Sequence, residues 1–124
     1  MQIIIRLEKE MKKIIKYLII EKMTDKDQYW LRMTPEMQDD IGTVGYIQFK
    51  NTDKTELKEN DEIMALEASK AVLTLKMPLD AKVVEWNKAV ITKPALVSSH
   101  KDEENWIMII SDINADVFSK LEDF

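Results

Sequence analysis

Two apolar runs, residues 61–68 and 71–78, flank Ser69-Lys70 and constrain the fold of this chain more than any other stretch. Each run alternates with the two-residue period of a β-strand. Folding the stretch back at this dipeptide creates three cross-strand pairs: Ala68 with Ala71, Leu66 with Leu73, and Met64 with Leu75. The stretch therefore predicts a β-hairpin whose tip displays Lys70 beside small side chains that leave its ammonium uncovered.

The same alternation assigns side chains to the two faces of this hairpin. One face would carry five apolar or small residues: Ile63, Ala65, Leu73, Leu75 and Met77. The other face would carry four residues: Met64, Leu66, Val72 and Thr74.

The segments on either side of the hairpin make the lysine motif a more specific sign of function than the turn alone. A lysine in a turn is most often a solvated side chain, and a Glu-x-x-Lys motif alone occurs by chance in many proteins. Here residues 57–62 read Leu-Lys-Glu-Asn-Asp-Glu, and residues 77–87 read Met-Pro-Leu-Asp-Ala-Lys-Val-Val-Glu-Trp-Asn. With Glu67-Ala68-Ser69-Lys70-Ala71 between them, they resemble the lipoyl-lysine hairpin of lipoyl carrier domains. Among these, the H protein of the glycine cleavage system is the most similar, from about Thr34 to the C-terminus.

This resemblance implies that lipoate is attached covalently to Lys70 by a lipoate ligase or lipoyltransferase. Glu67, Ser69 and Ala71 would be the flanking residues that the attaching enzyme recognises. The protein would be a carrier with a swinging arm and would catalyse no reaction itself. Biotin carriers share the fold but typically place methionine on both sides of the lysine, so Ser69 and Ala71 favour lipoate. An unmodified structural domain is a further alternative.

The resemblance also implies the fold class. We expect a mainly β protein, a flattened barrel or sandwich of two antiparallel sheets (the barrel-sandwich hybrid of biotinyl and lipoyl carriers), with short helices and a C-terminal helix. Residues 11–124 would form this lipoyl-carrier domain, and residues 1–10 a dispensable N-terminal extension.

Local patterns predict the elements before the lysine hairpin. Residues 14–21 and 29–33 are strand-like, and Asp25 and Asp27 supply turn chemistry between them, which predicts another hairpin. Thr34 is expected to cap a short helix that begins at Pro35 and stops at Gly42. Residues 43–49 then form a strand.

The second half follows the same reasoning. We expect strands at residues 82–86 and 105–110, with a short turn or helix at 94–97 between them. Asn114 would cap a terminal helix from Ala115 to about Asp123, which would lay Val117, Phe118 and Leu121 on the sheet. Asn60 stands where relatives have glycine, and asparagine tolerates the left-handed conformation of a turn. Ala81 replaces a second such glycine, so the bend there should be built differently.

Composition excludes several other functions. The net charge of −5 opposes nucleic-acid binding, and the absence of cysteine excludes thiolate metal sites while fitting a cytoplasmic protein. The single histidine, His100, lacks partners for a zinc site or a catalytic triad, so no metal is expected. Charges interrupt each N-terminal apolar run well short of the length that a membrane span needs. We expect a monomer, with Trp30, Trp86 and Trp106 anchoring the core or its rim.

The N-terminal strands indicate the pathway in which the carrier would act. H proteins of glycine cleavage carry a Glu-His-Glu-Trp segment, whereas the segment that aligns best here is Leu18-Ile19-Ile20-Glu21. This departure makes the chain more similar to the H-like carriers of Gram-positive bacteria. That subfamily implies a sirtuin-type ADP-ribosyltransferase and a macrodomain hydrolase as partners, in a response to oxidative stress. Asp25 and Asp27 would be possible ADP-ribose acceptors. The alternative is an aminomethyl shuttle that serves the glycine cleavage components.

Overall fold

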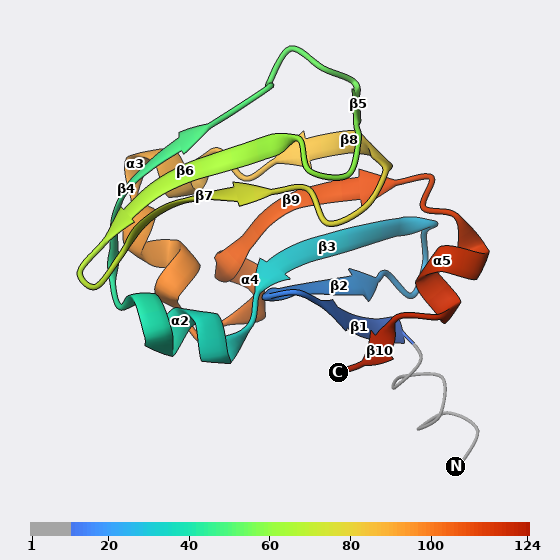
Figure 1. Ribbon diagram of the computed structural model, residues 1–124, viewed down its shortest axis with the longest axis horizontal. Coiled ribbons are helices and arrows are strands. Elements are labelled where there is room, and N and C mark those ends of the chain that lie inside the picture. The colour runs from blue at the N-terminus through green and yellow to red at the C-terminus, as the bar shows by residue number, and fades with distance from the viewer. Residues whose placement is uncertain (1–10) are drawn as a thin grey trace.

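The computed structural model describes residues 11–124, which form two antiparallel sheets with short helices at their ends (Figure 1). The strands are β1 (Lys12–Ile15), β2 (Leu18–Lys22), β3 (Gln28–Met33), β4 (Val44–Phe49), β5 (Glu56–Leu57), β6 (Glu62–Ala68), β7 (Val72–Lys76), β8 (Ala81–Trp86), β9 (Trp106–Ser111) and β10 (Glu122–Asp123). The helices are α2 (Pro35–Ile41), α3 (Ala89–Thr92), the 3₁₀ helix η1 (Pro94–Ser98), α4 (Asp102–Asn105) and α5 (Ala115–Ser119).

The two sheets differ in size. The larger has the strand order β10-β1-β2-β3-β9-β8-β5, and the smaller has the order β4-β6-β7. The sheets face each other without strand pairing between them in the described residues, so they do not close into a barrel. The predicted mainly β sandwich is therefore confirmed, and the flattened barrel is replaced by two open sheets.

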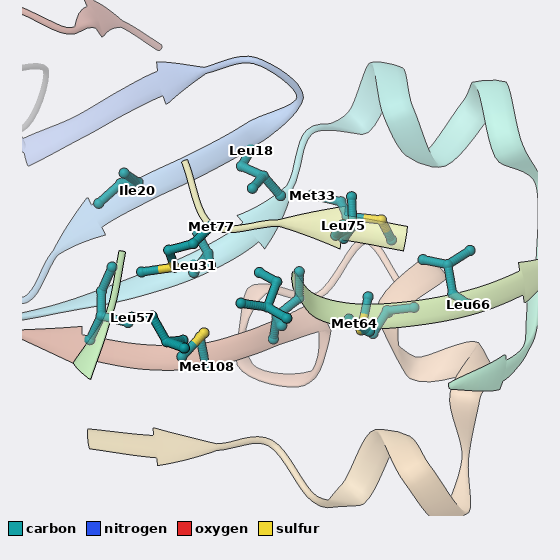
Figure 2. Close-up of a cluster of buried hydrophobic side chains, with 14 of the residues drawn as sticks. Leu18, Ile20, Leu31, Met33, Leu57, Met64, Leu66, Leu75, Met77 and Met108 are labelled. Carbon is teal, nitrogen blue, oxygen red and sulfur yellow. The ribbon is translucent and has the colours of Figure 1, made fainter. Parts of the chain in front are cut away.

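The core fills the space between these sheets, and Figure 2 shows side chains of both meeting there. Many of its residues have no exposed surface, among them Ile20, Leu31, Leu57, Ile63, Met64, Met77, Ile107, Met108 and Ile110. The three tryptophans lie half-buried at the rim, where Trp30 packs edge-on against Trp106 and Trp86 packs on Phe49. Among residues 11–124, no helix has the length and apolar character that crossing a membrane would need.

The hairpin β6–β7 has the predicted register. Met64 pairs with Leu75 and Leu66 with Leu73, and the Ala68 N–H donates to the Ala71 carbonyl at 2.8 Å. The predicted division of its faces is wrong, because Met64, Leu66, Leu75 and Ile63 are all buried whereas Val72 is 77% exposed. Directly paired residues share a face, and an irregularity between Glu62 and Met64 turns Ile63 inward as well.

The N-terminal strand prediction needs a correction. Residues 14–21 do not form one strand, because a tight turn at Lys16-Tyr17 divides β1 from β2. Lys16 adopts the left-handed conformation there, with φ of 58°, although no glycine, proline or asparagine announces a turn. The hairpin of β2 and β3 is confirmed. The proposed extension, residues 1–10, lies outside the described residues.

The helices follow their capping signals, with one exception in length. Thr34 caps α2 by accepting the Met37 N–H at 3.0 Å, and the Asn114 side chain accepts the N–H groups of Asp116 and Val117. The C-terminal helix α5 ends at Ser119, not near Asp123, because the chain turns back to form β10. Phe118 and Leu121 pack on the core as predicted, whereas Val117 is 45% exposed.

The C-terminal residues occupy the outer edge of β1. Lys13 pairs with Asp123, and Ile14 pairs with Glu122. The Lys13 side chain is buried, forms an ion pair with Asp123, and lies over the Phe118 ring. Elsewhere, Asn60 adopts a φ of 76°, as predicted, and Ala81 begins β8, because the bend lies earlier, at Pro78 and Leu79.

Candidate functional site

Lys70 lies exposed at the tip of the β6–β7 hairpin. Figure 1 shows this tip beside α2. The two-residue turn Ser69-Lys70 places this side chain at the extreme end of the smaller sheet. A short, tightly closed turn limits backbone freedom, so the site displays its amine from a fixed position.

The tip is held by hydrogen bonds to residues outside the hairpin. The Lys70 N–H donates to the Ile41 carbonyl at 2.8 Å, and the Ser69 N–H donates to the Thr43 carbonyl at 2.9 Å. In return, the Thr43 N–H donates to Ser69 Oγ at 3.2 Å. The last turn of α2 and the residues after it therefore form a seat for the tip.

The seat is itself fixed to the rest of the fold. The buried amide of Gln38 in α2 donates to the carbonyls of Val97 and Ser99, at 2.8 and 3.0 Å. The Val44 N–H donates to Ser98 Oγ at 3.1 Å. Helix α2 is thus tied to η1, and the tip rests on an anchored element.

The Lys70 side chain bends back over the end of α2. Its ammonium lies 3.5 Å from the Asp39 carbonyl oxygen, in the last turn of the helix, where unpaired carbonyls concentrate partial negative charge. Within residues 11–124, no carboxylate lies within ion-pair distance of this amine. The amine is therefore exposed to solvent and is not held by an ion pair.

The three flanking residues lie in different surroundings. Ser69 contacts the seat, as described, and Ala71 packs against the edge of the core. Glu67 is exposed, and the strand register places it between Tyr46 of β4 and Val72 of β7. A protein that approaches Lys70 along the outer face of the hairpin would meet this row of side chains.

A polar hollow of about 280 Å³ lies at the foot of the Lys70 side chain. Asp39, Thr43, Ser98 and His100 line it together with Lys70. Sequence reasoning treated His100 as an isolated loop residue, and no motif indicated that the loop after η1 approaches the hairpin. The hollow adds hydrogen-bonding side chains beside the amine.

The structure does not bring Asp25 and Asp27 near Lys70. Both are exposed in the loop between β2 and β3, at the end of β3 opposite α2. The six residues of β3 span about 20 Å, which separates this loop from the end where the tip is seated.

The segment Leu18 to Glu21 carries one carboxylate, and that carboxylate is already bound. Glu21 Oε1 accepts from Nη1 of Arg32 at 2.6 Å, and the Arg32 side chain is 7% exposed. The same guanidinium donates to the Asp102 carbonyl and lies over Trp30. Glu21 therefore balances a buried charge.

Comparison with known proteins identifies the family. The family model described as glycine cleavage H-protein matches residues 15–123. The chain is 43% identical to a glycine cleavage system H-like protein of Staphylococcus aureus, over 90% of this chain and 97% of that protein. The chain belongs to the glycine cleavage H-protein family.

Other members of the H-protein family are more distant. A glycine cleavage system H protein of Listeria welshimeri is 28% identical over 78% of both chains. The crystal structure of a glycine cleavage system H protein from Mycobacterium marinum superposes with a TM-score of 0.68, at 15% identity, covering 90% of this chain and 94% of that one. The fold of this H-protein family member is thus shared across large differences in sequence.

Proposed function

We propose that this H-protein family member is a lipoyl carrier in which lipoate is joined to Nζ of Lys70 by an amide bond. The observation that carries the proposal is an exposed amine, free of carboxylates, at a hairpin tip that the fold holds still. A tethered group raises its own effective concentration at each docked partner, and this requires a rigid base and a flexible arm. The hairpin is the base, the lysine and lipoyl chains are the arm, and the carrier itself catalyses nothing.

Co-expression with a lipoate ligase in lipoate-supplemented medium tests this proposal by intact mass. We expect one lipoyl group per chain, and none when Lys70 is replaced by Arg. Lys76→Arg, a change at an exposed lysine of β7, is the matched control and should remain fully modified. Exchanging Ser69 and Lys70 should also abolish modification. An unmodified wild-type chain, a biotinyl adduct, or equal modification of the exchanged variant would refute the proposal.

We also propose that the carrier belongs to the H-like group and is ADP-ribosylated once lipoylated, as part of a cytoplasmic response to oxidative stress. Two observations support this over an aminomethyl shuttle. Glu21 is bound to the buried Arg32, so it is not free to pair with the amine of an aminomethyl group. The 43% identical relative is itself named an H-like protein. Its partners would be a lipoate ligase or lipoyltransferase, a sirtuin-type ADP-ribosyltransferase and a macrodomain hydrolase.

Two parallel reactions separate these pathways. Lipoylated protein is incubated with the ADP-ribosyltransferase and NAD, or with the decarboxylase of glycine cleavage and glycine. We expect an ADP-ribosyl adduct that the macrodomain hydrolase removes, and no aminomethyl adduct. Asp25→Asn with Asp27→Asn should abolish the adduct, and Asp39→Asn with Asp40→Asn is the control pair nearer Lys70. An aminomethyl adduct without ADP-ribosylation would favour the glycine shuttle instead.

A further inference from the structure

Gly42, which ends α2, has a backbone conformation that other residues avoid. Its φ is 79° and its ψ is −163°, a region that only glycine adopts readily. Its N–H closes the helix by donating to the Gln38 carbonyl at 3.1 Å. A side chain here would therefore be strained even in open space.

The space beside Gly42 is also occupied by the hairpin tip. A Cβ atom at this position would lie 2.1 Å from Ser69 Oγ and 3.3 Å from Cγ of Lys70. The first distance is far below contact distance, and Ser69 Oγ cannot move away without losing its bond from the Thr43 N–H. The tip thus reaches the carbonyls of Ile41 and Thr43 through a space that a side chain at Gly42 would enter, and the positive φ of Gly42 adds strain to that clash.

Gly45, the other glycine of the chain, offers a contrast in the adjacent strand. A Cβ atom there would lie 4.0 Å from the Glu67 carbonyl oxygen, which is an ordinary contact. Its φ is not positive. Adding a methyl group at Gly45 therefore changes neither the backbone nor the tip.

The Ser69-Lys70 turn lies beyond the last strand pairs, Val44 with Ala68 and Glu67 with Val72, so its position depends on the bonds to Ile41 and Thr43. We infer that Gly42 is a positioning residue for the acylation of Lys70, and that the attaching enzyme binds the tip only while it is seated on the end of α2. The inference rests on the proposed lipoylation and adds a recognition element made from two parts of the chain. If the seated tip is the form that binds, unseating reduces the population of that form and raises the apparent KM by the same factor.

The test compares steady-state lipoylation of wild type, Gly42→Ala and Gly45→Ala by one lipoate ligase. For Gly42→Ala we expect KM to rise about tenfold or more with little change in kcat, and for Gly45→Ala both constants should stay within about twofold. Partial global unfolding would raise the apparent KM in the same way, because it lowers the concentration of folded substrate. Thermal unfolding of each variant reports that loss separately.

Hydrogen exchange of the Lys70 backbone N–H reports seating without any enzyme. This proton should be protected in wild type and in Gly45→Ala, and exchange freely in Gly42→Ala. If Gly42→Ala does not fold, Ser69→Ala removes the bond from the Thr43 N–H without backbone strain and should raise KM about twofold to threefold. An unseated tip that is still lipoylated with wild-type KM would overturn the inference. A wild-type protein with a protected tip but no lipoylation would refute the proposed function instead.

Discussion

The tip of the β6–β7 hairpin and the loop between β2 and β3 are both exposed turns between antiparallel strands, but they are held differently. The tip bonds to Ile41 and Thr43, which lie outside its hairpin. The hydrogen bonds that close the other loop stay within it: the Met23 N–H donates to the Gln28 carbonyl, and the Lys22 ammonium reaches the carbonyls of Met23 and Lys26.

The difference indicates which of the two turns an enzyme can recognise by its shape. Contacts to another element fix a turn relative to the whole molecule, whereas contacts within a loop fix only its own shape. An enzyme that must select one lysine can recognise the first kind of turn as a surface. The loop with Asp25 and Asp27 presents exposed carboxylates on a turn that is closed by its own hydrogen bonds, so the proposed ADP-ribosylation would depend on access more than on geometry.

Moving the five-residue lysine motif into the loop between β2 and β3 is expected to have the largest effect. We replace residues 24–28 with Glu-Ala-Ser-Lys-Ala in a Lys70→Arg background. Because the new lysine has no seat, we expect no lipoylation by intact mass, although the five-residue motif is complete. Lipoylation of this variant at a rate near that of wild type would show that the motif suffices. Thermal unfolding confirms that the variant is folded.

Weakening the seat from a distance should have a smaller effect. Thr34→Ala removes the oxygen that accepts the Met37 N–H at the start of α2, and it should lower the free energy of unfolding by about 1 kcal/mol. Fraying of α2 should also speed hydrogen exchange at the Lys70 N–H. Thr52→Ala, in an exposed loop, is the control and should stay within about 0.5 kcal/mol of wild type in urea unfolding. Equal stability of the two variants would contradict the role of the cap.

The smallest expected effect is on the pKa of Tyr29, which lies next to the loop between β2 and β3. Burial, and then the nearby carboxylate of Asp27, raise the pKa of Tyr29 above its usual value. Asp27→Asn should lower this pKa, but not to the usual value, because burial is the larger cause and remains. A tyrosinate absorbance titration measures it in a background with Tyr17 and Tyr46 changed to Phe. If Asp27→Asn returned the pKa of Tyr29 to its usual value, the charge of Asp27, not burial, would be the main cause.

The raised pKa of Tyr29 also sets the sign of a pH effect on stability. The folded state holds the phenol neutral to higher pH than the unfolded state does. This contribution is therefore fully present below the unfolded pKa of about 10 and is lost as pH rises through the folded pKa. Asp27→Asn should soften the loss of stability in alkaline urea unfolding.

Local patterns predicted those elements whose causes are local. The register of β6–β7 follows from side-chain alternation, and the start of α2 follows from Thr34 and Pro35, so both agree with the structure. The turn at Lys16 was missed because its left-handed residue is a lysine. The length of α5 was overestimated because pairing of β10 with β1, a tertiary contact, ends the helical stretch.

The place of Lys70 at an exposed hairpin tip could be predicted from the sequence, but the residues around it could not. Gly42 is recognisable as a helix stop, yet nothing local indicates that Ser69 fills the space beside it. The bond between Thr43 and Ser69 joins residues 26 positions apart, and such contacts depend on how the sheets pack. The approach of His100 to the hollow has the same origin.

The short strand β10 has a consequence for self-association. An unpaired sheet edge offers a row of N–H and C=O groups to any other extended chain. Two residues, Glu122 and Asp123, cover that row on β1, and Asp123 also neutralises the buried Lys13. Without this pairing, part of the β1 edge would be open to other strands and Lys13 would lack its ion pair, so β10 opposes edge-to-edge association.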